Sequence, residues 1–152
     1  MRTKAYLDVE NLIRTPEPTG EDLRWLQAVI RPLFRDDTQV VWATTQWAIA
    51  NDPELAWGWP GAQLKVTYGG PDASDRALSE TMAGDPLALF DQVVIGSGDG
   101  HFIPQAAELA ASGLHVVVLS HLECLHPVLR LAAHDVYLMP PVPGSTGEAL
   151  VA

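Results

Sequence analysis

The sequence is poor in cysteine, in long apolar runs and in basic residues. Its one cysteine, Cys124, rules out a disulfide within the chain and favours a reducing compartment. The apolar runs Val93–Ile95 and Leu114–Leu119 are far shorter than the ~20 residues of a membrane helix. The first residues do not have the charged and apolar regions of a signal peptide. These absences predict a cytoplasmic protein with no membrane partner.

Basic residues are outnumbered: nine Lys and Arg stand against nineteen Asp and Glu, giving a formal net charge of −10. Such a charge opposes the binding of a polyanion such as a nucleic acid. Six of the nine basic residues lie within the first 35 residues, which hold five acidic residues. A nucleic-acid partner must therefore contact the N-terminal part of the chain or be held through metal ions.

The chain has enough apolar material for one folded domain. Its 152 residues are 47% hydrophobic and 18% charged, a composition that argues against a disordered chain and against two full-sized cores. The last segment, 140–152, is rich in Pro and Gly and is expected to be a disordered tail. The sequence thus predicts a single domain over 1–139.

Short apolar segments alternate with helical patterns along the chain. Strands are expected near 4–8, 39–45, 64–68, 92–95, 115–119 and 136–138. Helices are expected near 19–33, 72–83, 104–112 and 127–133, whereas 10–20 has the pattern of a loop and 47–57 is ambiguous. Apolar strands alternating with helices are typical of an α/β domain whose mostly parallel sheet has helices on both faces.

Three acidic residues fall where such a fold binds ligands, at the carboxyl ends of its strands. Asp8 ends the first expected strand, Asp99 follows the fourth, and Asp75 begins the helix that precedes the fourth. Clustered carboxylates repel one another unless a proton or a cation is present. Oxygen ligands of this kind suit Mg²⁺ or Mn²⁺, which can activate water and stabilise the charge of a phosphodiester under attack. Such an ion would also allow an acidic protein to act on a polyanion.

Three segments in order resemble the motifs of NYN domains, which belong to the PIN-like nucleases. DVEN at 8–11 resembles the D-x-x-N opening, PDASDRAL at 71–78 the second acidic element, and IGSGDGHF at 95–102 the S-G-D-x-D-F signature. Segments 113–118 and 125–138 resemble the next strand and the closing segment, so the likeness extends to about Met139. It implies a PIN-like Rossmannoid fold and a ribonuclease that depends on Mg²⁺ or Mn²⁺ and acts on RNA.

The resemblance also implies roles for particular residues. Asp8, Asp75 and Asp99 would be catalytic and would hold the metal together with His101. Asn11, Ser97 and Arg14 would bind substrate or orient the ligands. His101 departs from the pattern because the family has a second Asp there, and imidazole suits Mn²⁺ or Zn²⁺ better than Mg²⁺. The alternative is a catalytically impaired module that binds RNA or a protein partner.

Several of these residues also have an ordinary structural interpretation. Asp72 and Asp75 have the spacing of a capping box, so the second could serve only the start of a helix. The glycines of the 96–100 loop do not have the spacing of a dinucleotide-binding loop, and a nucleotide-binding regulatory domain rests on fold analogy alone. The cluster of His121, Cys124 and His126 has no second pair of ligands for structural zinc.

The tryptophans bear on the expected partners. Trp42 and Trp25 fall on apolar patterns and are expected in the core. Trp47, Trp57 and Trp59 flank a loop, where they could stack on bases or cover the partner in a homodimer. Packing in the core or in an interface is the favoured interpretation.

Overall fold

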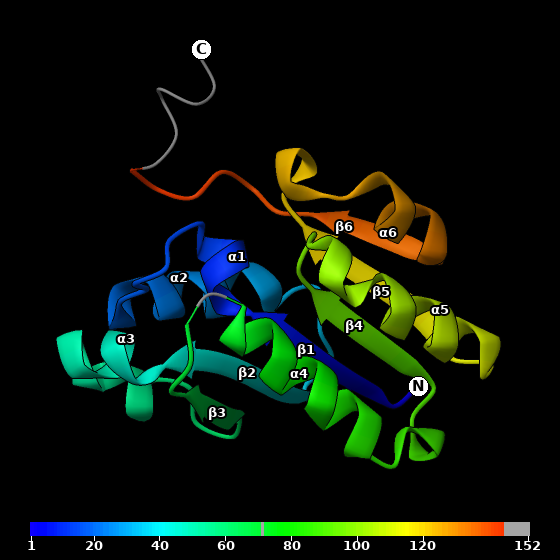
Figure 1. Cartoon of the computed structure of the whole chain (residues 1–152), viewed down its shortest axis with the longest axis horizontal. Helices are drawn as coiled ribbons and strands as arrows, with labels where there is room; N and C mark the ends of the chain where they lie inside the picture. Colours follow the sequence, from blue (N-terminus) through cyan, green and yellow to red (C-terminus); the bar gives the residue numbers. More distant parts are fainter. Residues whose placement is uncertain (71, 145–152) are drawn as a thin grey trace.

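Six parallel strands form one sheet in the order β3-β2-β1-β4-β5-β6 (Figure 1). The structure is a computed structural model that describes residues 1–70 and 72–144. The strands are β1 (Thr3–Asp8), β2 (Gln39–Thr45), β3 (Gln63–Thr67), β4 (Gln92–Gly96), β5 (His115–Ser120) and β6 (Asp135–Leu138). The chain moves outward from β1 in one direction and from β4 in the other, so the order reverses between these two neighbours. The predicted α/β domain with a parallel central sheet is confirmed.

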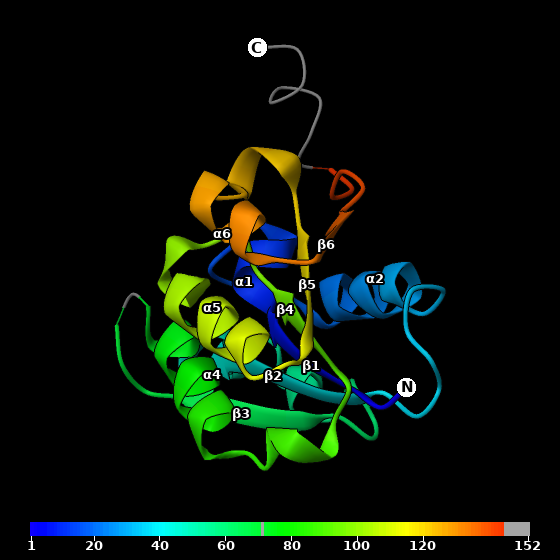
Figure 2. The same ribbon diagram turned by 90° about the vertical axis from the view of Figure 1, so that its right-hand side faces the viewer.

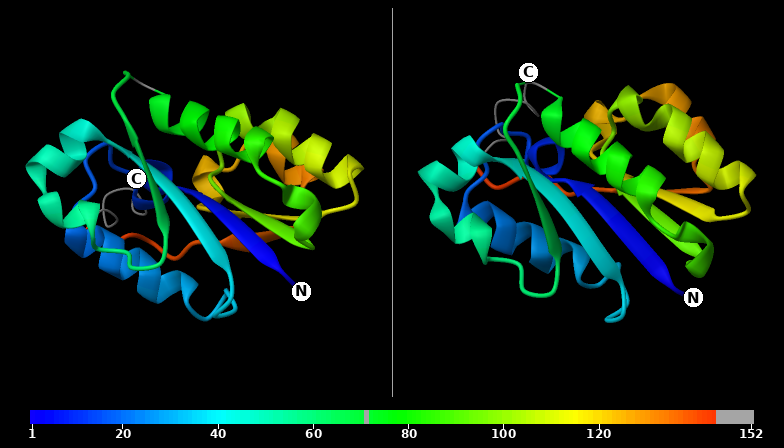
Figure 3. Two further views of the ribbon diagram at one scale, coloured as in Figure 1. Left: turned by 90° about the horizontal axis from the view of Figure 1, so that it is seen from below. Right: turned by 60° about the horizontal axis from the view of Figure 1, so that its bottom comes forward.

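Helices cover both faces of this sheet. They are α1 (Val9–Ile13), α2 (Gly20–Ile30), α3 (Gln46–Asn51), α4 (Ala73–Gly84), α5 (Ile103–Ala111) and α6 (Pro127–Ala132). Short 3₁₀ helices are η1 (Pro53–Ala56), η2 (Leu87–Leu89), η3 (Gly100–Phe102) and η4 (Leu122–Cys124). Figure 2 shows α2 on one face and α4, α5 and α6 on the other, and Figure 3 shows the same two layers from below.

The two layers follow from the apolar residues of the central strands, which alternate between the faces. In β1, Leu7 packs in the cluster that contains Leu26 of α2, and Tyr6 in the cluster that contains Leu78 of α4. All four side chains are almost completely buried, and each such burial stabilises the fold by about 1.5–3 kcal/mol. A strand that is apolar on both faces needs helices on both faces to bury it. The two helical layers could therefore be predicted from the apolar strands of the sequence.

The expected loop over 10–20 is wrong in its first part, where the structure has helix α1. The helix begins because the Asp8 carboxylate accepts a hydrogen bond from the Asn11 backbone N–H at 3.3 Å. Val9 and Leu12 are buried against the sheet, and the helix ends at Arg14 in the left-handed region at φ 63°. A helix of five residues is too short to show the 3.6-residue periodicity by which helices are recognised.

Two other regions resolve what the pattern left open. The ambiguous stretch 47–57 forms α3 and η1. The Thr45 hydroxyl accepts the Ala48 N–H at the start of α3, and the Asp52 carboxylate accepts the Glu54 N–H at the start of η1, both at 3.2 Å. After β6, Val142 is only 5% exposed and belongs to the core cluster, so packing continues beyond the expected boundary at 139. The rest of the expected tail, 145–152, lies outside the described residues. Of the helices described, none is long and apolar enough to span a membrane.

Candidate functional site

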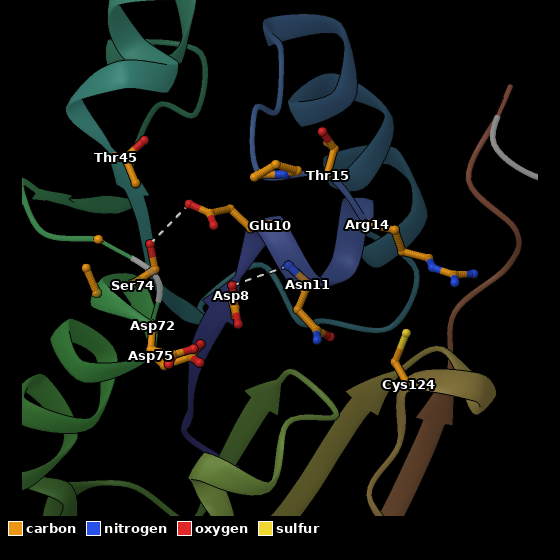
Figure 4. A pocket seen from close by; sticks show the side chains of 13 residues that line it. Asp8, Glu10, Asn11, Arg14, Thr15, Thr45, Asp72, Ser74, Asp75 and Cys124 are labelled. Carbon is orange, nitrogen blue, oxygen red and sulfur yellow. Dashed lines mark hydrogen bonds between the residues drawn. The ribbon is translucent and has the colours of Figure 1, made fainter.

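A cavity of about 420 Å³ opens at the carboxyl edge of the sheet, beside the point where strand order reverses. Its walls are the end of β1, helix α1 and the first turn of α4, with a contribution from η4 (Figure 4). This is the position at which open parallel sheets bind ligands. The polar side chains that line it are Asp8, Glu10, Asn11, Arg14, Thr15, Thr45, Asp72, Ser74, Asp75 and Cys124.

A pair of buried carboxyl groups lies at the base of this cavity. Asp8 is 5% exposed and Asp75 is 6% exposed, although they are 67 positions apart in the sequence. Burial raises the pKa of Asp8 well above its ordinary value, and a hydrogen bond with Asp75 and the charge of Asp75 raise it further. The Asn11 N–H opposes these effects. Two carboxyl groups can share a hydrogen bond only when one is protonated, so Asp8 in the metal-free protein holds a proton more tightly than an isolated Asp does.

Glu10 adds a third acidic group at the same wall. Burial raises the pKa of Glu10, the Ser74 hydroxyl that donates to its Oε1 at 3.3 Å lowers it, and the charge of Asp75 raises it again. Glu10 also acts on Asp8, whose pKa its charge raises slightly. The cavity therefore concentrates negative charge in a partly dehydrated space, which favours a bound proton or cation.

Helix α1 and the loop after β4 each donate a hydrogen bond to the Asp8 carboxylate. The Ser97 hydroxyl donates to Asp8 Oδ2 at 3.4 Å, while the Asn11 N–H donates to Oδ1. The Asn11 side chain in turn accepts the Gly98 N–H at 3.2 Å, which ties α1 to the loop after β4. Asn11 and Ser97 thus occupy the orienting positions expected from the sequence, with Ser97 behind the cavity rather than at its surface.

Asp99 and His101 are not among the residues that line the cavity. The Asp99 carboxylate accepts the His101 backbone N–H at 2.8 Å and so begins η3. His101 Nε2 lies 2.8 Å from the Ser79 hydroxyl, which also donates to the Asp75 carbonyl. His101 therefore reaches Asp75 only through Ser79, and the Asp99 N–H reaches Asp8 only through the Ser97 hydroxyl, which accepts it at 3.1 Å. The four side chains expected to hold the metal do not lie together around the cavity.

The start of α4 differs from the expected capping box. Asp72 stands at the N-cap in the left-handed region at φ 66° and makes no side-chain cap hydrogen bond. An N-cap side chain reaches the N–H groups of the first turn from extended backbone, and Asp72 does not have that conformation. Asp75 is consequently not engaged in capping, and its carboxyl group is directed to Asp8 (Figure 4).

The donor set suits a hard divalent cation with an open shell. Asp8 and Asp75 supply carboxylate oxygens, and Mg²⁺ is bound in many enzymes by one or two carboxylates with water and substrate phosphate completing the shell. Over residues 1–70 and 72–144, no group of three or more His, Cys, Asp or Glu side chains is placed so that it could hold a metal ion. The cavity therefore offers a cation two buried carboxyl groups, with water or substrate left to complete the shell, and it does not fit structural zinc.

The histidines and the cysteine near the cavity have other roles. His121 is buried, with Nε2 2.7 Å from the Leu12 carbonyl, and His126 Nδ1 accepts the Val128 N–H at the start of α6. Burial raises the pKa of Cys124, Arg14 lowers it and Glu123 raises it, so its thiol stays protonated at neutral pH. A protonated thiol is a poor nucleophile, which argues against covalent catalysis by this residue.

Of the five tryptophans, Trp42 is buried and packs on Trp59, with ring centroids 6.4 Å apart, and Trp25 is partly buried against the same cluster. Trp47 and Trp57 are more than half exposed. The expectation of a core position is thus confirmed for Trp42. For Trp47 and Trp57 the favoured packing in the core is wrong, and packing in an interface or stacking on bases stays a prediction.

Sequence reasoning missed Glu10, Ser74 and Ser79. Glu10 occupies a variable position of the DVEN segment, and nothing in a linear pattern sets it apart from a surface residue. A signal existed for Ser74, which directly precedes Asp75 at the start of a helix aimed at the same edge. Ser79 is recognisable only from its contacts.

Gly98 is expected to be essential for the geometry of the site. A Cβ at this position would overlap the Cys124 carbonyl and the Ser120 hydroxyl, and backbone cannot move aside as a flexible side chain can. Gly98→Ala should therefore destabilise the fold by about 1–3 kcal/mol, measured by thermal denaturation. Gly84→Ala is the matched control, because nothing outside its own helix lies within 4 Å of the added methyl group, and it should leave the melting temperature unchanged or raise it slightly, since Ala is the better helix former. Equal melting temperatures for the two variants would contradict the close approach at Gly98.

No known protein family and no curated protein matches the sequence. Among solved structures, the chain is similar to the crystal structure of a protein of unknown function from Vibrio parahaemolyticus, with a TM-score of 0.60. The two share 17% sequence identity over 93% of this chain and 94% of that chain. At this level of identity the likeness concerns the fold alone.

Proposed function

We propose that this protein is a ribonuclease dependent on Mg²⁺ or Mn²⁺, with the carboxyl pair of Asp8 and Asp75 at its centre. The observation that carries the proposal is that two acidic side chains from distant segments are buried together at the ligand-binding edge of the sheet. Burying a repelling pair lowers stability unless a proton or cation compensates it, and such arrangements are concentrated at functional sites.

The chain's own residues would bind and orient the reactants. Asp8 and Asp75 would hold the cation, with Glu10 close enough to support them. The cation, when bound, would supply positive charge to the phosphodiester and lower the pKa of the attacking water. Asn11 of α1 and Ser97 of the loop after β4 keep Asp8 fixed, so the carboxylate does not have to reorganise during the reaction.

RNA is the proposed substrate because of the ordered motifs that resemble NYN domains. Two of them, DVEN at 8–11 and the segment around Asp75, form the cavity wall, and the third supplies Ser97 and Gly98 behind it. The net charge of −10 opposes contact with a polyanion, and a bound cation would reduce that repulsion at the site. This accounts for a nuclease site on an acidic protein.

The test is cleavage of a labelled single-stranded RNA by the purified protein in Mg²⁺ or Mn²⁺. Asp75→Asn should lower the rate by roughly 10²–10³ or more, because it removes a charge that stabilises the transition state through the cation. Asp36→Asn, an exposed acidic residue outside the site, should cleave at the wild-type rate. EDTA should abolish the activity. Cleavage that is insensitive to both EDTA and Asp75→Asn would exclude the proposed site.

One observation favours the alternative of a catalytically impaired module that binds RNA or a protein partner. His101 stands where the family pattern has an acidic residue, and its imidazole is engaged with Ser79 instead of lining the cavity. A site with one acidic ligand fewer holds a second cation poorly. RNA binding without cleavage in either Mg²⁺ or Mn²⁺ would support this alternative.

A further inference from the structure

The acidic cavity has one basic side chain among the described residues that line it, Arg14. The residue follows α1 directly, and its backbone N–H donates to the Glu10 carbonyl. Its left-handed conformation turns the chain sharply at the cavity wall. The side chain is therefore attached to the same short helix that carries Glu10 and Asn11.

The guanidinium of Arg14 is held away from the carboxyl pair. Its Nη1 lies 2.6 Å from Oε1 of Glu123, a residue of η4 that is 109 positions further along the chain. Figure 4 shows the side chain extending away from Asp8 and Asp75, on the side of Cys124. Both partners of the ion pair are partly exposed, at 35% and 54% of their side chains.

The chemistry of this pair resembles that of a phosphate contact. A guanidinium binds a carboxylate and a phosphate through the same planar set of N–H donors. Because exposed ion pairs contribute little to stability, an incoming phosphate can replace Glu123 with little loss. An arginine on a long side chain can then turn toward a phosphate at the mouth of the cavity.

We propose that Arg14 binds a backbone phosphate of RNA beside the Asp8 and Asp75 pair, and that Glu123 occupies Arg14 until RNA displaces it. The proposal rests on the proposed function for the identity of the ligand, and it names the contact that positions the RNA. Glu123 acts as a competitor in the free protein, and it limits binding of anions to those that outcompete a carboxylate.

The competing interpretation is that the ion pair only ties α1 to η4. The two interpretations predict opposite effects of Glu123→Gln. If Glu123 competes with RNA, its removal frees Arg14 and tightens binding. If the pair is only a tie, removing either partner loosens the same wall of the cavity and weakens binding alike.

The experiment measures fluorescence anisotropy of a short labelled single-stranded RNA in EDTA, so that binding is separated from cleavage. Arg14→Gln should weaken binding about tenfold, as expected for loss of a hydrogen bond to a charged group. It should also reduce the slope of log K against log salt by about 0.7, the value for one phosphate contact on a single strand. Glu123→Gln should tighten binding roughly two- to fivefold, the range of an exposed ion pair.

Arg24→Gln and Glu54→Gln are the matched controls, because these residues form an ion pair between α2 and η1 and do not line the cavity. Each control removes one charge away from the cavity, so its RNA affinity should change only slightly, toward weaker binding in Arg24→Gln and tighter binding in Glu54→Gln, and by less than in the Arg14 and Glu123 variants. Weaker binding by Glu123→Gln, or an unchanged salt slope in Arg14→Gln, would overturn the phosphate site, as would the absence of RNA binding by the wild type. If Arg14→Gln weakens RNA binding and Glu123→Gln tightens it, but no RNA is cleaved in Mg²⁺ or Mn²⁺, the phosphate site stands and the nuclease proposal fails.

Discussion

Asp8→Asn is expected to remove cleavage and, at the same time, to make the metal-free protein more stable. The first effect follows because the variant loses a negatively charged ligand of the proposed cation, which should lower the rate by roughly 10³ or more. The second follows because the substitution removes the free-energy cost of burying Asp8 beside Asp75, which at neutral pH is either charge repulsion or uptake of a proton, while an amide oxygen can still accept the Asn11 N–H. A gain of about 1 kcal/mol at neutral pH is typical for removal of such a conflict, and it raises the melting temperature by about 2–4 °C.

Thermal denaturation in EDTA and a cleavage assay in Mg²⁺ measure the two effects on the same preparations. Asp36→Asn removes one negative charge from the exposed surface and should change neither the melting temperature nor the cleavage rate. A marked loss of stability in Asp8→Asn would mean that the carboxylate is an ordinary structural cap of α1. Retained cleavage would remove Asp8 from the chemistry.

The stability of the metal-free protein should fall as pH rises through the raised pKa of Asp8. An acid whose pKa is raised by folding binds its proton more tightly in the native state, so its contribution is fully present below the unfolded value and is lost above the folded one. Glu10, whose pKa is also raised, acts in the same direction. Asp85 acts in the opposite direction: burial tends to raise its pKa, but hydrogen bonds from Lys4 and Tyr6 and the charges of Lys4 and Lys65 lower it overall.

Mg²⁺ should restore the stability that the metal-free protein loses as pH rises, because the ion would replace the proton between the carboxylates. At about 100 times its dissociation constant the ion adds about 2.7 kcal/mol, which corresponds to a rise of about 5–10 °C in melting temperature. The rise should be largest at neutral pH and should shrink in mild acid, where protons compete. The difference between wild-type and Asp8→Asn curves isolates the contribution of the pair from that of Asp85. A Mg²⁺ effect of equal size in both proteins would show that the ion binds elsewhere.

Much of the fold was predictable because it depends on patterns that repeat along the chain. The apolar runs of β1, β4 and β5 require cover on both faces, and the alternation with helices leaves a parallel sheet as the simplest arrangement. The same reasoning placed Asp8 and Asp75 at one edge, since carboxyl ends of strands and N-termini of the following helices lie together.

The rest depended on local geometry that residue types do not determine. Asp99 turns its carboxylate to the His101 N–H, as Asp residues do in tight turns, and so it begins η3 without reaching the cavity. Asp72 takes a left-handed conformation that no spacing rule predicts. The contact between Arg14 and Glu123 joins residues 109 positions apart and depends on where η4 packs.

Calorimetric titration of Mn²⁺ at neutral pH into the wild type and into the double variant Asp8→Asn, Asp75→Asn tests the central claim most directly. We expect heat from binding in the wild type, weaker binding in mild acid, and an affinity lower by at least about 100-fold in the double variant. Equal affinity in the two proteins, or no binding by the wild type, would contradict the assignment of this carboxyl pair as a cation site.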